Sequence, residues 1–315
     1  MKKILFSILA LAALAGCAKE EILIQSPGEA IGFNSFVDNA TRATDPSYGG
    51  GQGQQALTSF NVWGTAGNVA IYANDTVTGT VGSEPVDGKE THVWNCTSKT
   101  QYWIENVTYN FAALVNAGTV ALGDNLLPAT VEFEANGSTD LMYAENKGMV
   151  GQPTGQNIPV NFTFAHLLSK VYIGVTNNSA TATGYSFLVK NIKINAPKTS
   201  GKYYIQDVEE NSETIAAGTW RATAGNYTFE NISVTGATAE CNAEQLLIPG
   251  SATVSFDVDI IYNGSTITTK NYSHAVALVA GHAYRFNIIA SIGDPIQFSV
   301  TDQPTWTNNG DITIQ

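Results

Sequence analysis

The stretch Phe256-Asp257-Val258-Asp259-Ile260 alternates apolar and acidic residues, and Tyr284-Arg285-Phe286-Asn287-Ile288 alternates in the same way. A period of two places successive side chains on opposite faces of a β-strand. Each stretch therefore predicts a strand with one face against a core and the other toward water. These two segments point to a fold made of sheets.

Further strand and turn patterns recur along the chain, and no stretch after the N-terminal leader has the pattern of an amphipathic helix. Strands are predicted at Val69–Tyr72, Val131–Phe133, Val171–Val175 and Ile192–Ile194. Hairpin turns are predicted at Asn136-Gly137, Asn263-Gly264 and Asn309-Gly310. Many short strands separated by turns are typical of β-sandwiches and barrels. We expect an all-β chain.

The composition excludes two classes of protein. The net charge is -12 and the sequence pI is about 4.7, whereas nucleic-acid binding needs a basic face. Aromatic residues make up 10% of the chain, enough material for a packed core, which argues against disorder.

The N-terminus is expected to be an export signal. Lys2 and Lys3 precede an apolar run from Ile4 to Leu14, too short to cross a membrane as a helix. The run ends in Leu14-Ala15-Gly16-Cys17, which resembles the lipobox of bacterial lipoproteins. That resemblance implies a signal peptide over residues 1–16 and a lipid on Cys17. The alternative is an ordinary signal peptide with an incidental cysteine.

Length predicts two domains after residue 42. We expect β-sandwiches at 43–157 and 158–293, because MVGQPTGQNI (149–158) reads as a boundary, with a tolerance of about ten residues on either side. The Gly-rich stretch 48–55 is expected to be a flexible linker. Cys96 and Cys241 lie far apart in the sequence, and we expect free thiols, with a disulfide as the alternative.

Metal and cofactor chemistry has little support in the sequence. The four histidines, His92, His166, His274 and His282, lack metal-ligand spacing, so we expect no metal site. His274 and His282 are expected to cap the two ends of a strand over 275–280. Asp207, Glu209 and Glu210 lack the Gly-centred loop of a calcium site. We expect no cofactor.

Catalysis is equally weakly supported. Asp257 and Asp259 would lie about 7 Å apart on one strand face, a separation that suits an inverting glycosidase. The outward face of a half-buried strand is, however, the ordinary place for carboxylates. A nucleophile elbow is also missing from the sequence, so we expect a protein that is not an enzyme.

Arg42 is one of three arginines in the chain, and its surroundings are unusual. Ile31, Phe33 and Val37 share one parity and Phe36 lies on the other face, which together predict a strand. This apolar segment precedes the Arg42–Ala43 bond, and the Gly-rich stretch follows. The alternative is a lipoprotein tether in which the arginine has no role.

The chain resembles the Bacteroidales fimbrillins, the type V pilus subunits that include the Mfa-like branch. The resemblance covers most of the sequence and rests on the order of degenerate motifs. These are Cys17, Ile31-Gly32-Phe33 before Thr41-Arg42-Ala43, Phe60–Gly64, Gln101-Tyr102-Trp103, Tyr109-Asn110-Phe111, Val160–Val175, Leu246–Pro249 and Gly281–Tyr284. Ala18–Glu21 also resembles the acidic tag that exports lipoproteins to the cell surface.

This resemblance implies two tandem Greek-key, transthyretin-like sandwiches and a precursor held on the outer membrane by its lipid. An arginine-specific surface protease would cut between Arg42 and Ala43 and release a propeptide, residues 17–42. A neighbouring subunit would then refill the vacated place with its C-terminal strand. Residues 294–315 alternate suitably for such a strand, at Ile296, Phe298 and Val300 and again at Ile312 and Ile314. Alternatively, these residues finish the second sandwich.

The expected function is a structural pilus subunit, in the shaft or at the tip, that supports adhesion. Its expected partners are other fimbrial subunits, the protease and the outer membrane, and no nucleic acid. Asp75-Thr76-Val77 also resembles an O-glycosylation acceptor, with Thr76 as the modified residue. The rival reading is a surface-tethered, non-polymerising lipoprotein that binds glycans through Trp63, Trp94 and Trp103.

Overall fold

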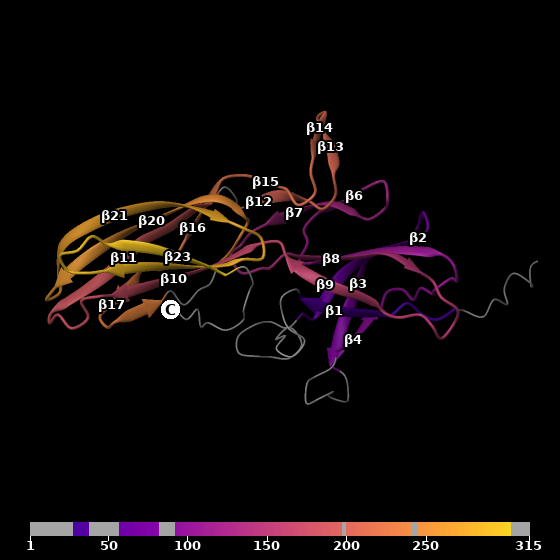
Figure 1. The fold of residues 1–315 in the computed structure, drawn as a ribbon, viewed down its shortest axis with the longest axis horizontal. Helices are drawn as coiled ribbons and strands as arrows, with labels where there is room; N and C mark the ends of the chain where they lie inside the picture. The colour runs from indigo at the N-terminus through magenta and orange to yellow at the C-terminus, as the bar shows by residue number, and fades with distance from the viewer. Residues whose placement is uncertain (1–27, 38–56, 82–91, 197–199, 241–244, 304–315) are drawn as a thin grey trace, which may run out of the picture.

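The structure, a computed structural model, describes residues 28–37, 57–81, 92–196, 200–240 and 245–303. All regular elements in these residues are β-strands, which confirms the prediction of an all-β chain. Figure 1 shows the strands in two main parts along the long axis, with the N-terminal strands in one and most later strands in the other.

The first part is a closed barrel. In ring order its strands are β1 (Phe33–Val37), β4 (His92–Cys96), β3 (Val69–Val81), β2 (Ser59–Ala66), β5 (Thr108–Val115), β8 (Met142–Val150) and β9 (Val160–His166). β9 shows why these segments form strands: Val160, Phe162 and Phe164 are buried, whereas Asn161 and Thr163 between them are exposed. The ring is closed because β1 pairs with both β4 and β9.

The second part consists of two facing sheets. One contains β18 (Thr238–Glu240), β10 (Ser169–Asn177), β22 (Ala283–Ala290) and β23 (Gln297–Gln303), with β19 (Gln245–Leu247) also paired to β10. The other contains β16 (Gly225–Thr228), β11 (Tyr185–Ala196), β20 (Gly250–Tyr262) and β21 (Ser265–Leu278), with β17 (Ile232–Val234) on β11. Both alternating stretches that indicated sheets lie in this part, in β20 and β22. Phe256, Val258 and Ile260 of β20 are buried in its core.

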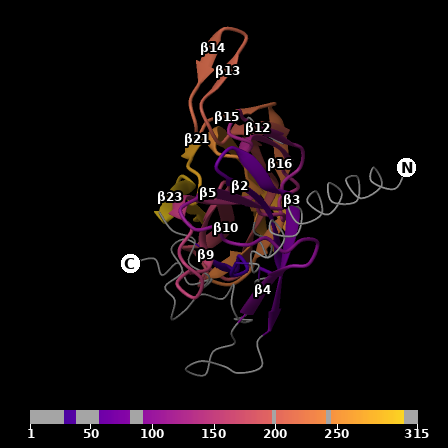
Figure 2. The ribbon, with the colours of Figure 1, turned by 90° about the vertical axis from the view of Figure 1, so that its right-hand side faces the viewer.

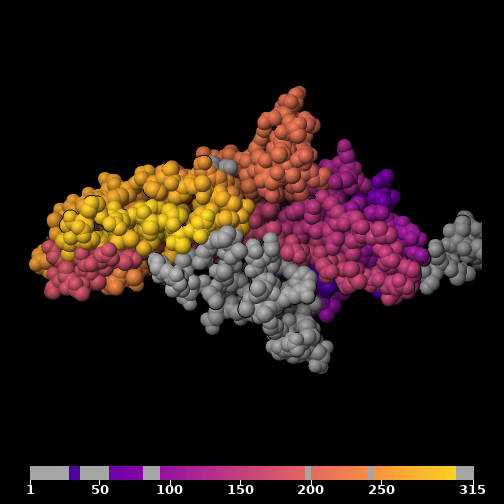
Figure 3. Space-filling view, in the orientation of Figure 1, coloured from indigo at the N-terminus to yellow at the C-terminus, as the bar shows by residue number. Residues whose placement is uncertain are grey.

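A smaller sheet connects the two parts. Its order is β15 (Trp220–Ala222), β12 (Ser200–Tyr204), β7 (Pro128–Glu134) and β6 (Val120–Leu122), so strands from both halves of the sequence pair in it. The hairpin of β13 (Val208–Glu210) and β14 (Glu213–Ile215) projects from this region, as Figures 1 and 2 show. In the space-filling view of Figure 3 the hairpin forms a knob above the body.

The two parts meet after β9. The barrel continues to His166, and the next sheet begins with Ser169. The domain seam expected at 157/158 stays a prediction. One hydrophobic core runs across the junction, because Trp63 and Leu114 from the barrel strands belong to the same buried cluster as the second part.

The turn predictions have different outcomes. Asn263 and Gly264 connect β20 to β21 with positive φ angles of 46° and 81°, which confirms that hairpin. The hairpin predicted at Asn136-Gly137 is wrong. There the Asn136 side chain accepts hydrogen bonds from the Ser138 and Thr139 amides, and Gly137 bridges to the distant Leu246. Asn309-Gly310 lies outside the described residues.

Candidate functional site

β1 is the strand that closes the barrel. Its residues pair in parallel with β9, in a register that places Phe33 beside Val160 and Val37 beside Phe164. On its other side, Phe33 pairs with Trp94 of β4 in the antiparallel sense. Removing β1 would leave β4 and β9 as two unpaired sheet edges, which are templates for another strand.

The inner face of β1 is buried in the barrel core. Ile31, Phe33 and Ser35 are only 7%, 4% and 1% exposed. Four aromatic rings surround Phe33 with centroids 5.5–6.3 Å away: Phe60, Tyr72, Phe111 and Phe162. Burial in this cluster raises the pKa of the Tyr72 hydroxyl above its usual range. The side chains of Phe36 and Val37 lie outside the described part.

The segment before β1 is bound on both sides as well. The Ile31 amide donates to the Gln101 carbonyl at 2.9 Å, and the Trp103 amide donates to the Glu29 carbonyl at 2.9 Å. On the opposite side, the Val160 amide donates to the Gly32 carbonyl at 2.8 Å. The ordered slot that β1 occupies therefore extends back to Glu29.

The Glu29 carboxylate is held by the loop between β8 and β9. Its Oε2 accepts a hydrogen bond from the Gly155 amide at 3.0 Å and from the Asn157 amide and side-chain Nδ2, each at 3.3 Å. The sequence pattern does not single out Glu29, because an acidic residue before a strand is ordinarily solvated. Its one available signal is that it shares the parity of the two apolar residues that follow it, Ile31 and Phe33.

The expected C-terminal donor segment lies partly in β23, which pairs with β22 at an edge of its own sheet. Ile296 is buried, Phe298 is half-buried and Val300 is 38% exposed. The Phe298 ring lies 5.8 Å from that of Phe256 across the core. The other donor candidates, Ile312 and Ile314, are outside the described residues.

Several predicted positions cannot be placed. Cys17, Arg42 and Ala43, as well as Cys241 and the Gly-rich stretch 48–55, lie outside the described residues. Among the described residues Cys96 is a free cysteine, with its Sγ 3.4 Å from the Ser98 hydroxyl.

Asp257 and Asp259 are engaged in structural contacts on the outer face of β20. The Lys190 ammonium donates to Asp259 at 2.6 Å, and this hydrogen bond, followed by one from Thr269, lowers the pKa of the Asp259 carboxyl. Hydrogen bonds from Asn191 and Asn271 likewise lower the pKa of Asp257. Both groups are held ionised by neighbours, and a general acid would need one of them protonated.

The described histidines make packing contacts or bond to carboxylates. His274 lies within β21, so the prediction that it caps a strand end is wrong; its ring packs 5.0 Å from Phe298. His282 does not cap that strand either, because β21 ends at Leu278; it precedes β22, and its Nδ1 lies 2.9 Å from Asp302. His166 Nδ1 lies 2.6 Å from Asp140 at the junction between the two parts. The described residues contain no group of ligands that could hold a metal ion.

The remaining acidic and hydroxyl candidates are exposed or bonded locally. Glu210 accepts hydrogen bonds from Lys202 and Tyr204, and Glu209 accepts one from Thr214. Thr76 lies exposed in β3, where its hydroxyl accepts a weak hydrogen bond from Asn61 at 3.4 Å.

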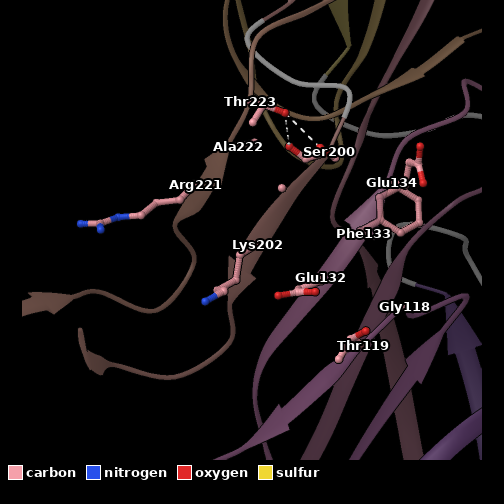
Figure 4. Close-up of a pocket in the computed structure, with 11 residues that line it drawn as sticks. Gly118, Thr119, Glu132, Phe133, Glu134, Ser200, Lys202, Arg221, Ala222 and Thr223 are labelled. Carbon is pink, nitrogen blue, oxygen red and sulfur yellow. Dashed lines mark hydrogen bonds between the residues drawn. The ribbon is translucent and has the colours of Figure 1, made fainter. Parts of the chain in front are cut away.

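The three tryptophans proposed as a sugar platform are core residues. Trp63, Trp94 and Trp103 are 3–5% exposed. A pocket of about 600 Å³ does lie on the connecting sheet, and Figure 4 shows its lining by charged residues of neighbouring strands, including Glu132, Lys202 and Arg221. None of the three tryptophans lines this pocket.

Solved structures with similar folds include two from Bacteroides species. A fimbrial protein of Bacteroides vulgatus is 15% identical, with a TM-score of 0.56 over 88% of this chain and 99% of its own. A candidate cell adhesion protein of Bacteroides uniformis is 16% identical, with a TM-score of 0.53 over 88% and 98%. At this identity the likeness shows the fold. No curated protein matches the sequence.

Two sequence profiles match the chain. Residues 1–18 match the lipid attachment site of prokaryotic membrane lipoproteins, which confirms the prediction of a lipoprotein. In the described residues, no helix has the length and apolar character needed to cross a membrane. Residues 41–303 match the fimbrillin-like profile. The chain therefore belongs to the fimbrillin-like family, as a surface-exposed fimbrial protein anchored to the membrane.

Proposed function

We propose that this chain is a structural, non-enzymatic pilus subunit that assembles by losing β1 and accepting a strand from a neighbour. The observation that carries the proposal is the position of β1 between β4 and β9, with a continuous buried inner face. Arg42 follows β1 by only a few residues, so one cut there would sever the strand from the rest of the barrel.

The burial energy of β1 is comparable to the net stability of a whole domain, so its removal would change the state of the barrel. Burying Ile31 and Phe33 contributes about 3–6 kcal/mol as an upper estimate, at about 1.5–3 kcal/mol for each side chain. A domain's net stability is about 5–15 kcal/mol. Losing β1 would thus consume a large part of the barrel's stability and leave an apolar groove with two open edges. Strand addition is a common way to satisfy such edges.

The precursor would reach the outer membrane with lipid on Cys17, and an arginine-specific surface protease would cleave between Arg42 and Ala43. Residues 294–315 would supply the incoming strand, and head-to-tail repetition gives an open filament. The tandem Greek-key, transthyretin-like description of the two parts belongs to this proposal, as does O-glycosylation at Thr76.

The rival glycan-binding lipoprotein has less support. Its proposed platform of Trp63, Trp94 and Trp103 is buried. Among the residues that line the charged pocket on the connecting sheet, Phe133 is the one aromatic residue, and it is only 6% exposed.

The test is to treat intact cells with an arginine-specific protease and sequence the N-terminus of the surface product. We expect a new N-terminus at Ala43 and ladders of oligomers. The Arg42→Ala variant should stay uncut and monomeric, whereas Arg221→Lys, a control within strand β15, should be processed normally. Polymerisation of the Arg42→Ala variant would contradict the proposal.

A further inference from the structure

The slot that holds β1 is selective at its N-terminal end. The amides of Gly155 and Asn157 and the Asn157 side chain converge on the Glu29 carboxylate. One residue earlier, a Cβ on Gly28 would lie 2.3 Å from the Trp103 carbonyl oxygen, so glycine is required there. The slot therefore fits the order glycine, acidic residue, any residue, apolar residue, any residue, aromatic residue.

The same order occurs once more near the C-terminus. The slot holds Gly28-Glu29-Ala30-Ile31-Gly32-Phe33, and residues 293–298 read Gly293-Asp294-Pro295-Ile296-Gln297-Phe298. Pro295 would take the place of Ala30, where a missing N–H is tolerated. The backbone bonds to the neighbouring chain there use the Glu29 carbonyl and the Ile31 amide, not a group of residue 30.

The second candidate donor segment does not fit this order. Placing Ile312 and Ile314 in the positions of Ile31 and Phe33 puts Gly310 at the carboxylate site and Asn309 where only glycine fits. Shifting the segment by one residue restores the glycine and the acid but puts Thr313 at the Ile31 position.

We infer that the β1 slot contains a carboxylate-recognition site, formed by Gly155 and Asn157, that selects residues 293–300 of a second copy of this chain. Asp294 of the incoming strand takes the place of Glu29. The inference rests on the proposed strand exchange and names the strand that the slot accepts.

The slot would bury the outer side chains of β23 more fully than its own sheet does. In its own sheet, Phe298 is half-buried and Val300 is 38% exposed, and β23 pairs on one side only. The matching slot positions, Phe33 and Ser35, are 4% and 1% exposed, and β1 has neighbours on both sides. In the slot, Phe298 and Val300 would be more deeply buried and the strand would pair on both sides. The same move uncovers β22 and the rings of Phe256 and Phe286, which lie 5.8 and 5.6 Å from Phe298 in the donor chain.

The test is a competition experiment on the full-length, unlipidated chain cleaved after Arg42. A labelled peptide of residues 27–39 reports occupancy of the slot, and unlabelled peptides compete with it. We expect peptide 292–303 to displace the label and peptide 306–315 to fail. The Asp294→Asn substitution should weaken competition about tenfold, because the neutral amide oxygen accepts the three hydrogen bonds less strongly than a charged carboxylate, and Asp294→Glu should preserve it. The Gly293→Ala peptide should also compete poorly.

The receptor provides the matched control. In an Asn157→Ala chain, the unsubstituted and Asp294→Asn peptides should differ less in how strongly they compete for the slot, because the side-chain donor to the carboxylate has been removed. Equal competition by these two peptides on the unsubstituted chain, or stronger competition by 306–315, would overturn the inference while leaving strand exchange intact. Failure of peptide 27–39 itself to bind the cleaved chain would instead overturn the proposed function, and the inference with it.

Discussion

The ring of Phe33 in β1 lies almost parallel to the ring of Phe162 in β9, with 9° between their planes and 6.0 Å between their centroids. The two residues are 129 positions apart in the sequence, yet they lie on neighbouring, paired strands of the barrel. Through this contact, β1, which lies before the predicted cleavage site, packs against the core of the barrel. After the proposed cleavage, that core would have to remain folded without β1.

Truncating Phe33 should weaken the precursor strongly. A Phe33→Ala substitution removes a ring that packs against four others, and large-to-small changes of this kind cost about 3–5 kcal/mol. Urea unfolding of the uncleaved chain should show the loss.

The control for that experiment is Asn34→Ala, on the opposite face of the same strand. Asn34 makes an exposed hydrogen bond to Asn161, so its loss should cost well under about 1 kcal/mol. Equal effects of the two substitutions would show that β1 is not anchored by its inner face.

The Lys190–Asp259 pair should make stability depend on pH in the acid range. The pKa of Asp259 is lowered in the folded chain, so its contribution is present above the ordinary aspartate value of about 3.9. It is lost as the pH falls through the lowered folded-state value. Lys190→Met should lower the free energy of unfolding by about 1–3 kcal/mol at pH 7. In this variant the free energy of unfolding should also fall less steeply between about pH 5 and 2 than in the unsubstituted chain.

Urea unfolding across this pH range measures both effects. Lys193→Met, at an exposed position on the same strand, is the matched control and should behave like the unsubstituted chain. An unchanged acid dependence in Lys190→Met would contradict the assignment of the lowered pKa to Lys190.

Trp103 distinguishes the structural account from the glycan-binding rival. The residue is 5% exposed, and its ring centroid lies 4.7 Å from that of Tyr109. Trp103→Ala should cost about 3–5 kcal/mol of stability. Polysaccharide retention by cells that display this variant should match retention by cells with the unsubstituted chain. Selective loss of polysaccharide binding with unchanged stability would favour the rival.

Period-two patterns predicted the strands well because they report burial on one face. The alternation at 256–260 and 284–288 lies within β20 and β22, although Asp259 and Asn287, which were expected to face water, are buried as well. The same rule identified Ile31 and Phe33 as apolar anchors, and both are buried.

Long-range pairing was not predictable from such local patterns. Nothing near Phe33 indicates that its partners are Val160 and Trp94, so the closure of the first part into a ring was not predicted. The prediction for His274 was wrong because only the apolar run after it was taken as a strand. The strand β21 in fact begins earlier, in an exposed, Thr-rich segment that lacks apolar alternation. The donors to Glu29 come from a loop more than a hundred positions away.

The most direct test of strand exchange is an engineered disulfide between β9 and the incoming strand. Asn161 pairs with Asn34 across β1 and β9, and the alignment of residues 293–298 on 28–33 puts Ser299 at the position of Asn34. Neighbouring Cα atoms across paired strands are close enough for a disulfide. Cys96 and Cys241 would first be replaced by serine.

A precursor chain carrying Asn34→Cys and Asn161→Cys should form an intramolecular disulfide. This control establishes that a disulfide can form between β9 and a strand in the slot at this position. In a chain carrying Asn161→Cys and Ser299→Cys, the account predicts covalent, reducible ladders on a denaturing gel only after cleavage at Arg42. If the control chain forms its disulfide but the cleaved Asn161→Cys, Ser299→Cys chain gives only monomers, the result would contradict the exchange of β1 for a neighbour's strand.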